Sequence, residues 1–147
     1  MFTNPIHEIT FEDVQTFCQE WTEGVRVEYK REINVKKHIP KAVSSFANTL
    51  GGTLIIGVEC DKEKNKVLSI NGIPPENGFE ERILETTLTH IYPAVIPTVK
   101  IVDMPDSDNM VVVVHVDESV QALIQFKTRQ KYIFVLEALV VPINLLI

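Results

Sequence analysis

Residues 23–30 read Glu-Gly-Val-Arg-Val-Glu-Tyr-Lys, and residues 40–61 read Pro-Lys-Ala-Val-Ser-Ser-Phe-Ala-Asn-Thr-Leu-Gly-Gly-Thr-Leu-Ile-Ile-Gly-Val-Glu-Cys-Asp. Apolar and charged residues alternate in the first stretch, which is the period-2 pattern of a strand with one face in the core. The second stretch begins with apolar residues at helical spacing, passes through two glycines and continues as a short apolar run typical of a buried strand. Together they predict a strand, a helix and a second strand in that order.

Spacing also predicts which side chains face inward. The residues of the first strand that are predicted to face the core are Val25, Val27 and Tyr29, and those that share its polar face are Arg26, Glu28 and Lys30. The helix is predicted from Ile39 to Leu50, with Pro40 in its first turn and Gly51 at a left-handed stop. Gly57, within the strand predicted over 53–58, indicates a close backbone approach or a bulge.

The flanking segments predict further elements of both kinds. Thr10 begins an amphipathic helix over 11–21, and a second amphipathic helix is predicted over 79–91. A polar turn at 61–66 precedes a strand over 67–70, and strands over 99–103 and 110–116 form a hairpin. Because helices and strands do not alternate regularly, the predicted class is α+β, a mostly antiparallel sheet with two to three helices packed on it.

Composition bounds the class of protein. The chain has 147 residues, of which 45% are hydrophobic, which predicts a single domain with one core. The polar and acidic start carries no secretion signal, so a cytoplasmic location is predicted. The final apolar segment, interrupted by Glu137 and Pro142, is too short for a membrane span. The two cysteines, Cys18 and Cys60, predict neither a zinc site nor a disulfide.

A basic cluster stands out against the net charge of -6, which argues against a protein that coats nucleic acid with its whole surface. Between residues 26 and 41 the candidate nucleic-acid contacts are Arg26, Lys30, Arg31, Lys36, Lys37 and Lys41, accompanied only by the acids Glu28 and Glu32. Lysines at a helix start are favoured phosphate contacts because free backbone N–H groups there also attract anions. The alternative interpretation is a solvated loop and helix start.

The order of these motifs resembles the Schlafen-type AlbA-like domain. The shared features are the glutamate-strand-lysine stretch, the helix, Ala-Asn-Thr-x-Gly-Gly at 47–52 and Ile-Gly-Val-acid at 56–59, within a resemblance from Thr22 to Gln121. The resemblance implies an AlbA-like, Schlafen-core lobe over residues 1–121, followed by an atypical apolar tail over 122–147. It also implies a regulatory or defence-associated nucleic-acid-binding module, in a family that has been associated with divergent AAA ATPases.

The resemblance further implies a three-acid site, because related domains in animal Schlafen proteins form part of a metal-dependent ribonuclease. Glu23 and Glu28 match two of the acids, but the third position falls on Cys60, between Glu59 and Asp61. A thiol is a poor ligand for Mg²⁺ or Mn²⁺. For a nuclease that uses one of these ions, the candidate catalytic residues are Glu23, Glu28 and Asp61, and the candidate metal ligands are Glu23, Glu28 and Glu59. In the alternative, Glu28 forms a salt bridge with Lys30 or Arg26 and no cofactor is expected.

The preferred prediction is a module without catalytic activity that binds DNA or RNA. The alternatives are a metal-dependent endoribonuclease and a non-catalytic protein-interaction remnant. Residues 51–52 do not form a phosphate loop because G-x-x-x-x-G-K-[ST] is absent. The sequence does not decide whether ATP binds elsewhere. A homodimer is predicted, with residues 110–116 as its contact. The tail is interpreted as a last strand, an oligomer contact or a reading-frame change, and the third is preferred because the resemblance stops where the sequence becomes apolar.

Overall fold

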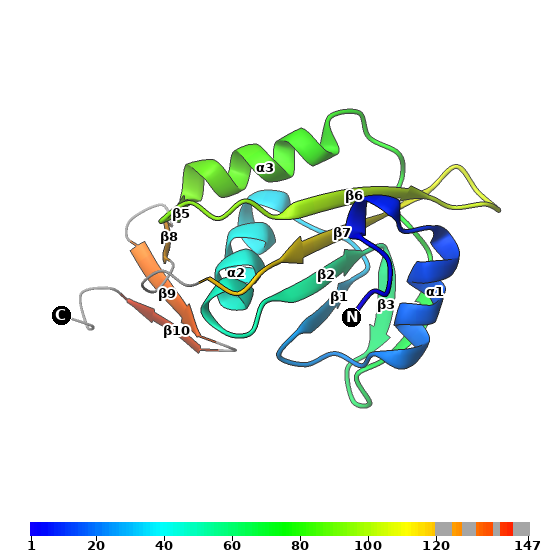
Figure 1. Cartoon of the computed structure of the whole chain (residues 1–147), viewed down its shortest axis with the longest axis horizontal. Coiled ribbons are helices and arrows are strands. Elements are labelled where there is room, and N and C mark those ends of the chain that lie inside the picture. The colour runs from blue at the N-terminus through cyan, green and yellow to red at the C-terminus, as the bar shows by residue number, and fades with distance from the viewer. Residues whose placement is uncertain (120–124, 128–131, 137–138, 143–147) are drawn as a thin grey trace.

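A four-stranded sheet in the order β1-β2-β7-β6 forms the centre of the computed structural model (Figure 1). Its strands are β1 (Val27–Lys30), β2 (Gly52–Ile56), β6 (Thr98–Asp103) and β7 (Met110–Val116). β1 and β2 are parallel and are joined by helix α2 (Val35–Asn48), as parallel neighbours require a crossover connection. The other two pairings in this sheet are antiparallel. The predicted α+β class with a mostly antiparallel sheet is confirmed.

The structure describes residues 1–119, 125–127, 132–136 and 139–142. Outside the central sheet these residues form the 3-10 turn η1 (Ile6–Glu8), the helices α1 (Phe11–Glu20) and α3 (Phe79–His90), and the hairpin β3 (Val58–Asp61) and β4 (Lys66–Ile70). A second four-stranded sheet has the order β10-β9-β8-β5 and consists of β5 (Ile91–Tyr92), β8 (Gln125–Lys127), β9 (Tyr132–Leu136) and β10 (Leu139–Pro142). Among the described residues, no helix is long and apolar enough to cross a membrane.

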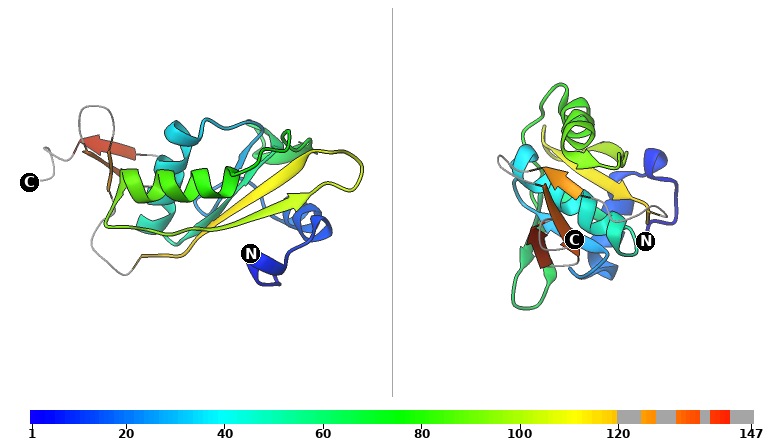
Figure 2. Two further views of the ribbon diagram at one scale, coloured as in Figure 1. Left: turned by 90° about the horizontal axis from the view of Figure 1, so that it is seen from above. Right: turned by 90° about the vertical axis from the view of Figure 1, so that its left-hand side faces the viewer.

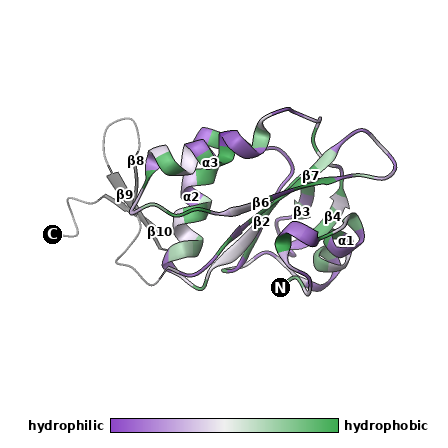
Figure 3. Cartoon of the chain, turned by 45° about the horizontal axis from the view of Figure 1, so that its top comes forward, coloured by the Kyte–Doolittle hydropathy of each residue, from purple (hydrophilic) through white to green (hydrophobic). Residues whose placement is uncertain are grey.

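Different elements cover the two faces of the central sheet (Figure 2). Helices α2 and α3 pack on one face, against side chains that include Leu54 and Val112. Helix α1 and the β3–β4 hairpin pack on the other face, against side chains that include Ile55 and Val111. The helices α1 and α3 carry both hydrophilic and hydrophobic residues (Figure 3), as expected for helices that bury one side. The protein therefore has a layer of elements on each face of one sheet.

The valine-rich strand β7 lies in the middle of this arrangement. It pairs with β2 along one edge and with β6 along the other. The side chains of Val111, Val112, Val113 and Val114 are all 0% exposed. The prediction that residues 110–116 form a dimer contact is therefore wrong, because this strand has neither a free edge nor an exposed side chain row. The homodimer itself stays a prediction.

Helix α1 begins as the sequence predicts. The Thr10 side chain accepts a hydrogen bond from the backbone N–H of Asp13, and the Asp13 carboxylate accepts one from the Thr10 backbone N–H at 2.8 Å. This reciprocal capping satisfies N–H groups that have no partner within the helix. The helix buries Val14, Phe17 and Cys18.

Helix α2 begins earlier than predicted, at Val35 rather than at Ile39. Asn34 caps it, because its side-chain oxygen accepts a hydrogen bond from the Lys37 N–H at 3.1 Å. Pro40 therefore lies inside the helix rather than in its first turn. The apolar pattern did not reveal the first turn, since Val35 is followed by three polar residues.

The end of α2 confirms one prediction and corrects another. Gly51 has a φ of 75°, and its N–H donates to the Phe46 carbonyl at 2.8 Å, which is the predicted left-handed stop. Leu50, however, is 57% exposed, because the helix ends at Asn48. Val25 is likewise 47% exposed, since β1 begins only at Val27. The predicted inward positions of Leu50 and Val25 are therefore wrong.

Gly57 divides the strand predicted over 53–58 into β2 and β3, which belong to different sheets. Its φ is 100°, and a Cβ atom there would lie 2.7 Å from the Cα atom of Gly72. The predicted close backbone approach at Gly57 is confirmed. The break sends the chain out of the central sheet into the β3–β4 hairpin.

Strands β8, β9 and β10 lie in the region predicted as an apolar tail. β8 pairs with β5, so this region is joined by hydrogen bonds to the part of the chain before residue 121. The last-strand interpretation agrees with these described segments. The predicted domain boundary at 121 and the reading-frame hypothesis remain predictions, and part of the tail lies outside the described residues.

Candidate nucleic-acid interface

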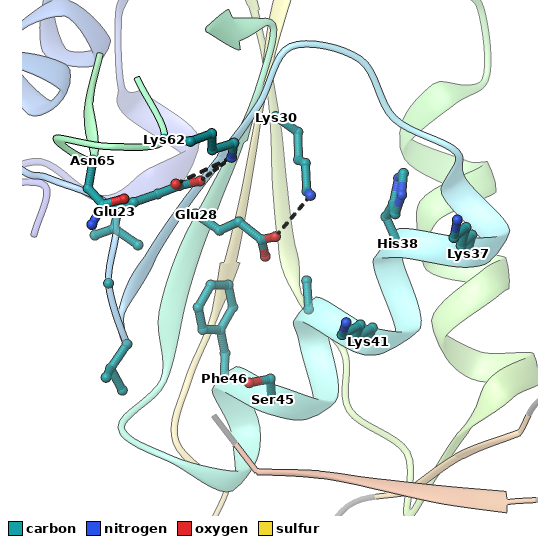
Figure 4. A pocket seen from close by; sticks show the side chains of 14 residues that line it. Glu23, Glu28, Lys30, Lys37, His38, Lys41, Ser45, Phe46, Lys62 and Asn65 are labelled. Carbon is teal, nitrogen blue, oxygen red and sulfur yellow. Dashed lines mark hydrogen bonds and ion pairs between the residues drawn. The ribbon is translucent and has the colours of Figure 1, made fainter. Parts of the chain in front are cut away.

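A groove of about 710 Å³ runs between the polar face of β1 and helix α2, beside the turn that joins β3 and β4 (Figure 4). Three separate parts of the chain line it. They are Glu23, Gly24, Val25, Val27, Glu28 and Lys30 in and before β1, Lys37, His38, Lys41, Ala42, Ser45 and Phe46 of α2, and Lys62 and Asn65 of the β3–β4 turn. Segments that are distant in sequence thus bring charged side chains to one place.

The strand side of the groove follows from the position of β1 at the edge of the sheet. Alternation turns Val27 and Tyr29 into the core on the α1 side of the sheet. Glu28 and Lys30 consequently point to the opposite side, toward α2 (Figure 4). Because α2 packs mainly over the inner strands β2 and β7, the polar side of β1 remains open at the edge.

The helix side of the groove carries cations. Lys37, Lys41 and Ser45 recur at every fourth residue, which places them on the same side of α2. Lys37 and Lys41 are exposed. Among the described residues, neither lysine has an ion-pair partner. These two ammonium groups are therefore available to an anionic ligand.

Glu28 and Lys30 form an ion pair across the strand face. The Lys30 Nζ atom lies 3.4 Å from a Glu28 carboxylate oxygen, and both side chains are about one-third exposed, at 31% and 33%. This pair is the salt bridge predicted as the alternative role of Glu28. Exposed pairs of this kind contribute at most about 1 kcal/mol, so either group can exchange its partner for a ligand.

Glu23 is held more firmly. Its carboxylate accepts a hydrogen bond from the Tyr29 backbone N–H at 3.1 Å and lies 3.3 Å from the Lys62 Nζ atom. The Glu23 backbone N–H donates to the carbonyl of Asn65 at 2.8 Å. The Glu23 side chain is only 15% exposed. Glu23 therefore ties the segment before β1 to both the strand edge and the β3–β4 turn.

The three residues at the end of β3 have different surroundings. Burial and the neighbouring Glu23 carboxylate raise the pKa of the Cys60 thiol, so the residue at the third acid position stays protonated at neutral pH. Glu59 lies 3.4 Å from an Arg31 nitrogen. Asp61 accepts hydrogen bonds from the backbone N–H groups of Glu63 at 2.9 Å and Lys64 at 3.3 Å. Neither Glu59 nor Asp61 lines the groove.

The residues present do not fit a magnesium or manganese site of the predicted kind. In the described part of the chain, no three His, Cys, Asp or Glu side chains lie together in a way that could hold a metal ion. Glu23 and Glu28 border the same groove, but a protonated thiol stands at the third position, whereas hard cations prefer oxygen ligands. Of the predicted metal ligands and catalytic acids, only Glu23 and Glu28 line the groove, and Glu59 and Asp61 do not.

His38 is a neutral hydrogen-bond donor of the groove. Burial and the positive charges of Lys30 and Lys37 lower the pKa of its imidazole. Its Nδ1 atom accepts a hydrogen bond from the Asn34 backbone N–H at 3.0 Å, so the proton of the neutral ring lies on Nε2. The Nε2–H group can donate to a phosphate or hydroxyl oxygen.

The groove is positively charged although the chain is acidic. Four lysines and two glutamates line it, which leaves an excess of two positive charges when His38 is neutral. Of the six predicted basic contacts, Lys30, Lys37 and Lys41 line the groove, and Arg26, Arg31 and Lys36 do not. The structure therefore divides the predicted basic cluster into two groups.

Lys62, His38 and Asn65 line the groove but were not predicted from the sequence as site residues. Lys62 and Asn65 lie in a polar turn that looks like an ordinary loop, and only the folding of β3–β4 against β1 brings them to the groove. His38 lies beside the predicted contact Lys37, but its lowered pKa leaves it neutral, so a search for charged residues does not find it. A capping asparagine at residue 34 was the signal that could have placed His38 in helix α2.

The sequence of the groove and its surrounding sheet matches a known family. The model of the family described as Schlafen, AlbA_2 matches residues 23–136. The chain belongs to this family. The match to the AlbA_2 family runs past residue 121, where the motif resemblance ends, and therefore includes the positions of β8 and β9. No curated protein matches the chain significantly.

Among the solved structures that match, two are similar to this chain in fold as follows. The N-terminal domain of a RecG-related protein from Nitrosomonas europaea, whose given name associates it with ATP-dependent DNA helicases, is similar with a TM-score of 0.64 and 21% identity, over 82% of each chain. The DIP2311 protein from Corynebacterium diphtheriae is similar with a TM-score of 0.53 and 17% identity, over 88% of this chain and 29% of the other. At these identities the likeness shows a shared fold alone, and this chain spans less than one-third of the second protein.

Proposed function

We propose that this AlbA_2 domain binds nucleic acid in the groove between β1 and α2, through the ammonium groups of Lys30, Lys37, Lys41 and Lys62. The observation that carries the proposal is the convergence of these four lysines, from three separate elements, on one groove of an acidic chain. Phosphate groups are the most abundant anions of DNA and RNA, and lysines bind them as point charges. The family and the RecG-related neighbour support a role beside nucleic acid. A regulatory or defence-associated role is part of the proposal.

The charge distribution limits the size of the contact. Lys37 and Lys41 are available at once, whereas Lys30 and Lys62 each share their charge with a glutamate. Each phosphate contact with duplex DNA contributes about -0.9 to the slope of log K against the logarithm of the salt concentration. Two to four contacts therefore predict a slope of about -1.8 to -3.6. The rest of the acidic surface repels the phosphate backbone, so binding is confined to a short stretch of nucleic acid.

The experiment is a low-salt titration of labelled structured RNA and duplex DNA. Wild type is compared with Lys37→Ala/Lys41→Ala and with Lys64→Ala/Lys66→Ala, a control that removes the same charge from exposed residues outside the groove. The groove variant is expected to bind more weakly and to reduce the slope by up to about 1.8, whereas the control follows wild type. Equal weakening in both variants would show that the groove is not the binding site.

The same titration distinguishes the alternatives. Cleavage of RNA that stops with chelator and in Glu28→Ala would establish a metal-dependent endoribonuclease. No salt-sensitive binding to RNA or DNA would instead favour a non-catalytic protein-interaction remnant.

A further inference from the structure

Each of the two glutamates in the groove forms an ion pair with a different lysine. The Lys62 Nζ atom lies 3.3 Å from Oε1 and 3.4 Å from Oε2 of Glu23. The Lys30 Nζ atom lies 3.4 Å from Oε1 of Glu28. Figure 4 shows both pairs as separate contacts on the wall of the groove. The two carboxylates that a divalent cation would need are thus neutralised by cations of the chain itself.

The two pairs differ in how the chain supports them. Glu23 also accepts the Tyr29 N–H, and its side chain is 15% exposed, while Lys62 is 69% exposed and reaches it from the β3–β4 turn. Glu28 and Lys30 lie on the same strand and are both partly exposed. Lys62 is therefore the ammonium group that joins two separate elements, and its presence depends on the hairpin beyond Gly57.

Electrostatics then favours one kind of ligand. With both glutamates paired, the charges of Lys37 and Lys41 remain, so the groove has a net charge that repels a divalent cation and attracts a phosphodiester. The protonated thiol of Cys60, beside Glu23, supplies no additional negative charge. A metal ion would have to displace Lys62 in order to use both oxygens of Glu23.

We propose that Lys62 and Lys30 act as tethered cations on Glu23 and Glu28, so that the groove binds phosphodiesters without a divalent metal ion and Lys62 is one of the residues that determine affinity. This inference rests on the proposed function of the groove, and it identifies which groups take the place of a metal. It assigns Glu23 a positioning role, because this carboxylate holds Lys62 at the groove.

The first test uses the protein alone. Mn²⁺ is titrated into wild type and into Glu23→Gln/Glu28→Gln, and the free ion is followed by electron paramagnetic resonance. Both proteins are expected to leave the same free Mn²⁺ signal. Uptake of one Mn²⁺ by wild type that the double variant loses would overturn the proposal, whether or not nucleic acid binds.

The second test measures nucleic-acid binding in chelator and in Mn²⁺ at equal ionic strength. Wild type is expected to bind equally in both. Lys62→Ala, at an exposed turn position, is expected to bind more weakly in both, with a salt slope reduced by about 0.9. Glu23→Gln, which leaves Lys62 without its ionic partner, is expected to weaken binding less than Lys62→Ala does. Binding that requires Mn²⁺, or an unchanged affinity of Lys62→Ala, would contradict this proposal alone, whereas no binding of wild type in either condition would contradict the proposed function as well.

Discussion

Replacing Gly57 with alanine is the sharpest test of how the fold positions the groove. Gly57 has a φ of 100°, and a Cβ atom added there would lie 2.7 Å from the Gly72 Cα atom and 3.1 Å from its carbonyl carbon. A side chain forced into this backbone region costs about 1–3 kcal/mol. Overpacking against backbone atoms that cannot move away adds about 1–3 kcal/mol. Gly57→Ala is therefore expected to lower the free energy of unfolding by about 2–6 kcal/mol.

The same substitution acts on the groove through hydrogen bonds. The Gly57 N–H donates to the carbonyl of Lys30 at 2.7 Å, and the Gly57 carbonyl accepts from the Gly72 N–H at 2.8 Å. A shift at Gly57 consequently moves the end of β1 and the hairpin that carries Lys62. Affinity for nucleic acid is expected to fall even where the variant remains folded.

Urea denaturation of wild type, Gly57→Ala and Gly24→Ala measures the first effect. Gly24 is a matched control, because a Cβ atom there meets no atom within 4 Å. Gly24→Ala is expected to change stability by at most about 0.5 kcal/mol. Equal stability of Gly57→Ala and wild type would mean that β2 and β3 join without the close approach to Gly72.

Three further predictions concern the elements around the groove. Thr10→Ala removes the cap that accepts the Asp13 N–H and is expected to lower thermal stability by about 1 kcal/mol, measured by calorimetry against Thr16→Ala at an exposed position of the same helix. Ile39→Ala, at a side chain that is 0% exposed, is expected to cost about 2–5 kcal/mol in urea denaturation, whereas Leu50→Ala costs little because Leu50 is 57% exposed. His38 has a pKa lowered by burial and by neighbouring lysines, so the unfolded chain binds the proton first and stability falls as the pH drops below about 6.5. His38→Gln is therefore expected to lose less stability than wild type between about pH 7.5 and about pH 5.5, and an equal loss would contradict the assignment of His38 as a neutral group.

The hydrophobic pattern predicted most of the fold because it reports which side of each element is buried. The inward positions Val27 and Tyr29, the capped start of α1 and the β6–β7 hairpin all follow from local spacing and turn chemistry. The failures lie where tertiary contacts override local patterns. Val25 precedes β1 and Leu50 follows α2, although each continues the apolar period of its element, and only the tertiary structure shows where the element begins or ends.

The site could be predicted only in part, because it is assembled from segments that are not adjacent in sequence. Lys30, Lys37 and Lys41 could be identified since they flank one strand and one helix, but Arg31 points elsewhere and pairs with Glu59. Lys62 could not be identified without knowing that the chain leaves the central sheet at Gly57. The salt bridge between Glu28 and Lys30 was predicted as an alternative, whereas the ion pair between Glu23 and Lys62 was not, because Lys62 lies far from Glu23 in the sequence.

The proposed binding site for nucleic acid lies between β1 and α2. The most direct measurement is a two-dimensional NMR titration of the isotope-labelled chain with a short duplex DNA and, separately, a structured RNA. The amide shifts that change are expected to cluster around residues 28–30, 37–45 and 62–65, and these changes are expected to be lost in Lys37→Ala/Lys41→Ala. Shift changes centred on another surface, with the groove residues unmoved at saturation, would contradict this proposed site.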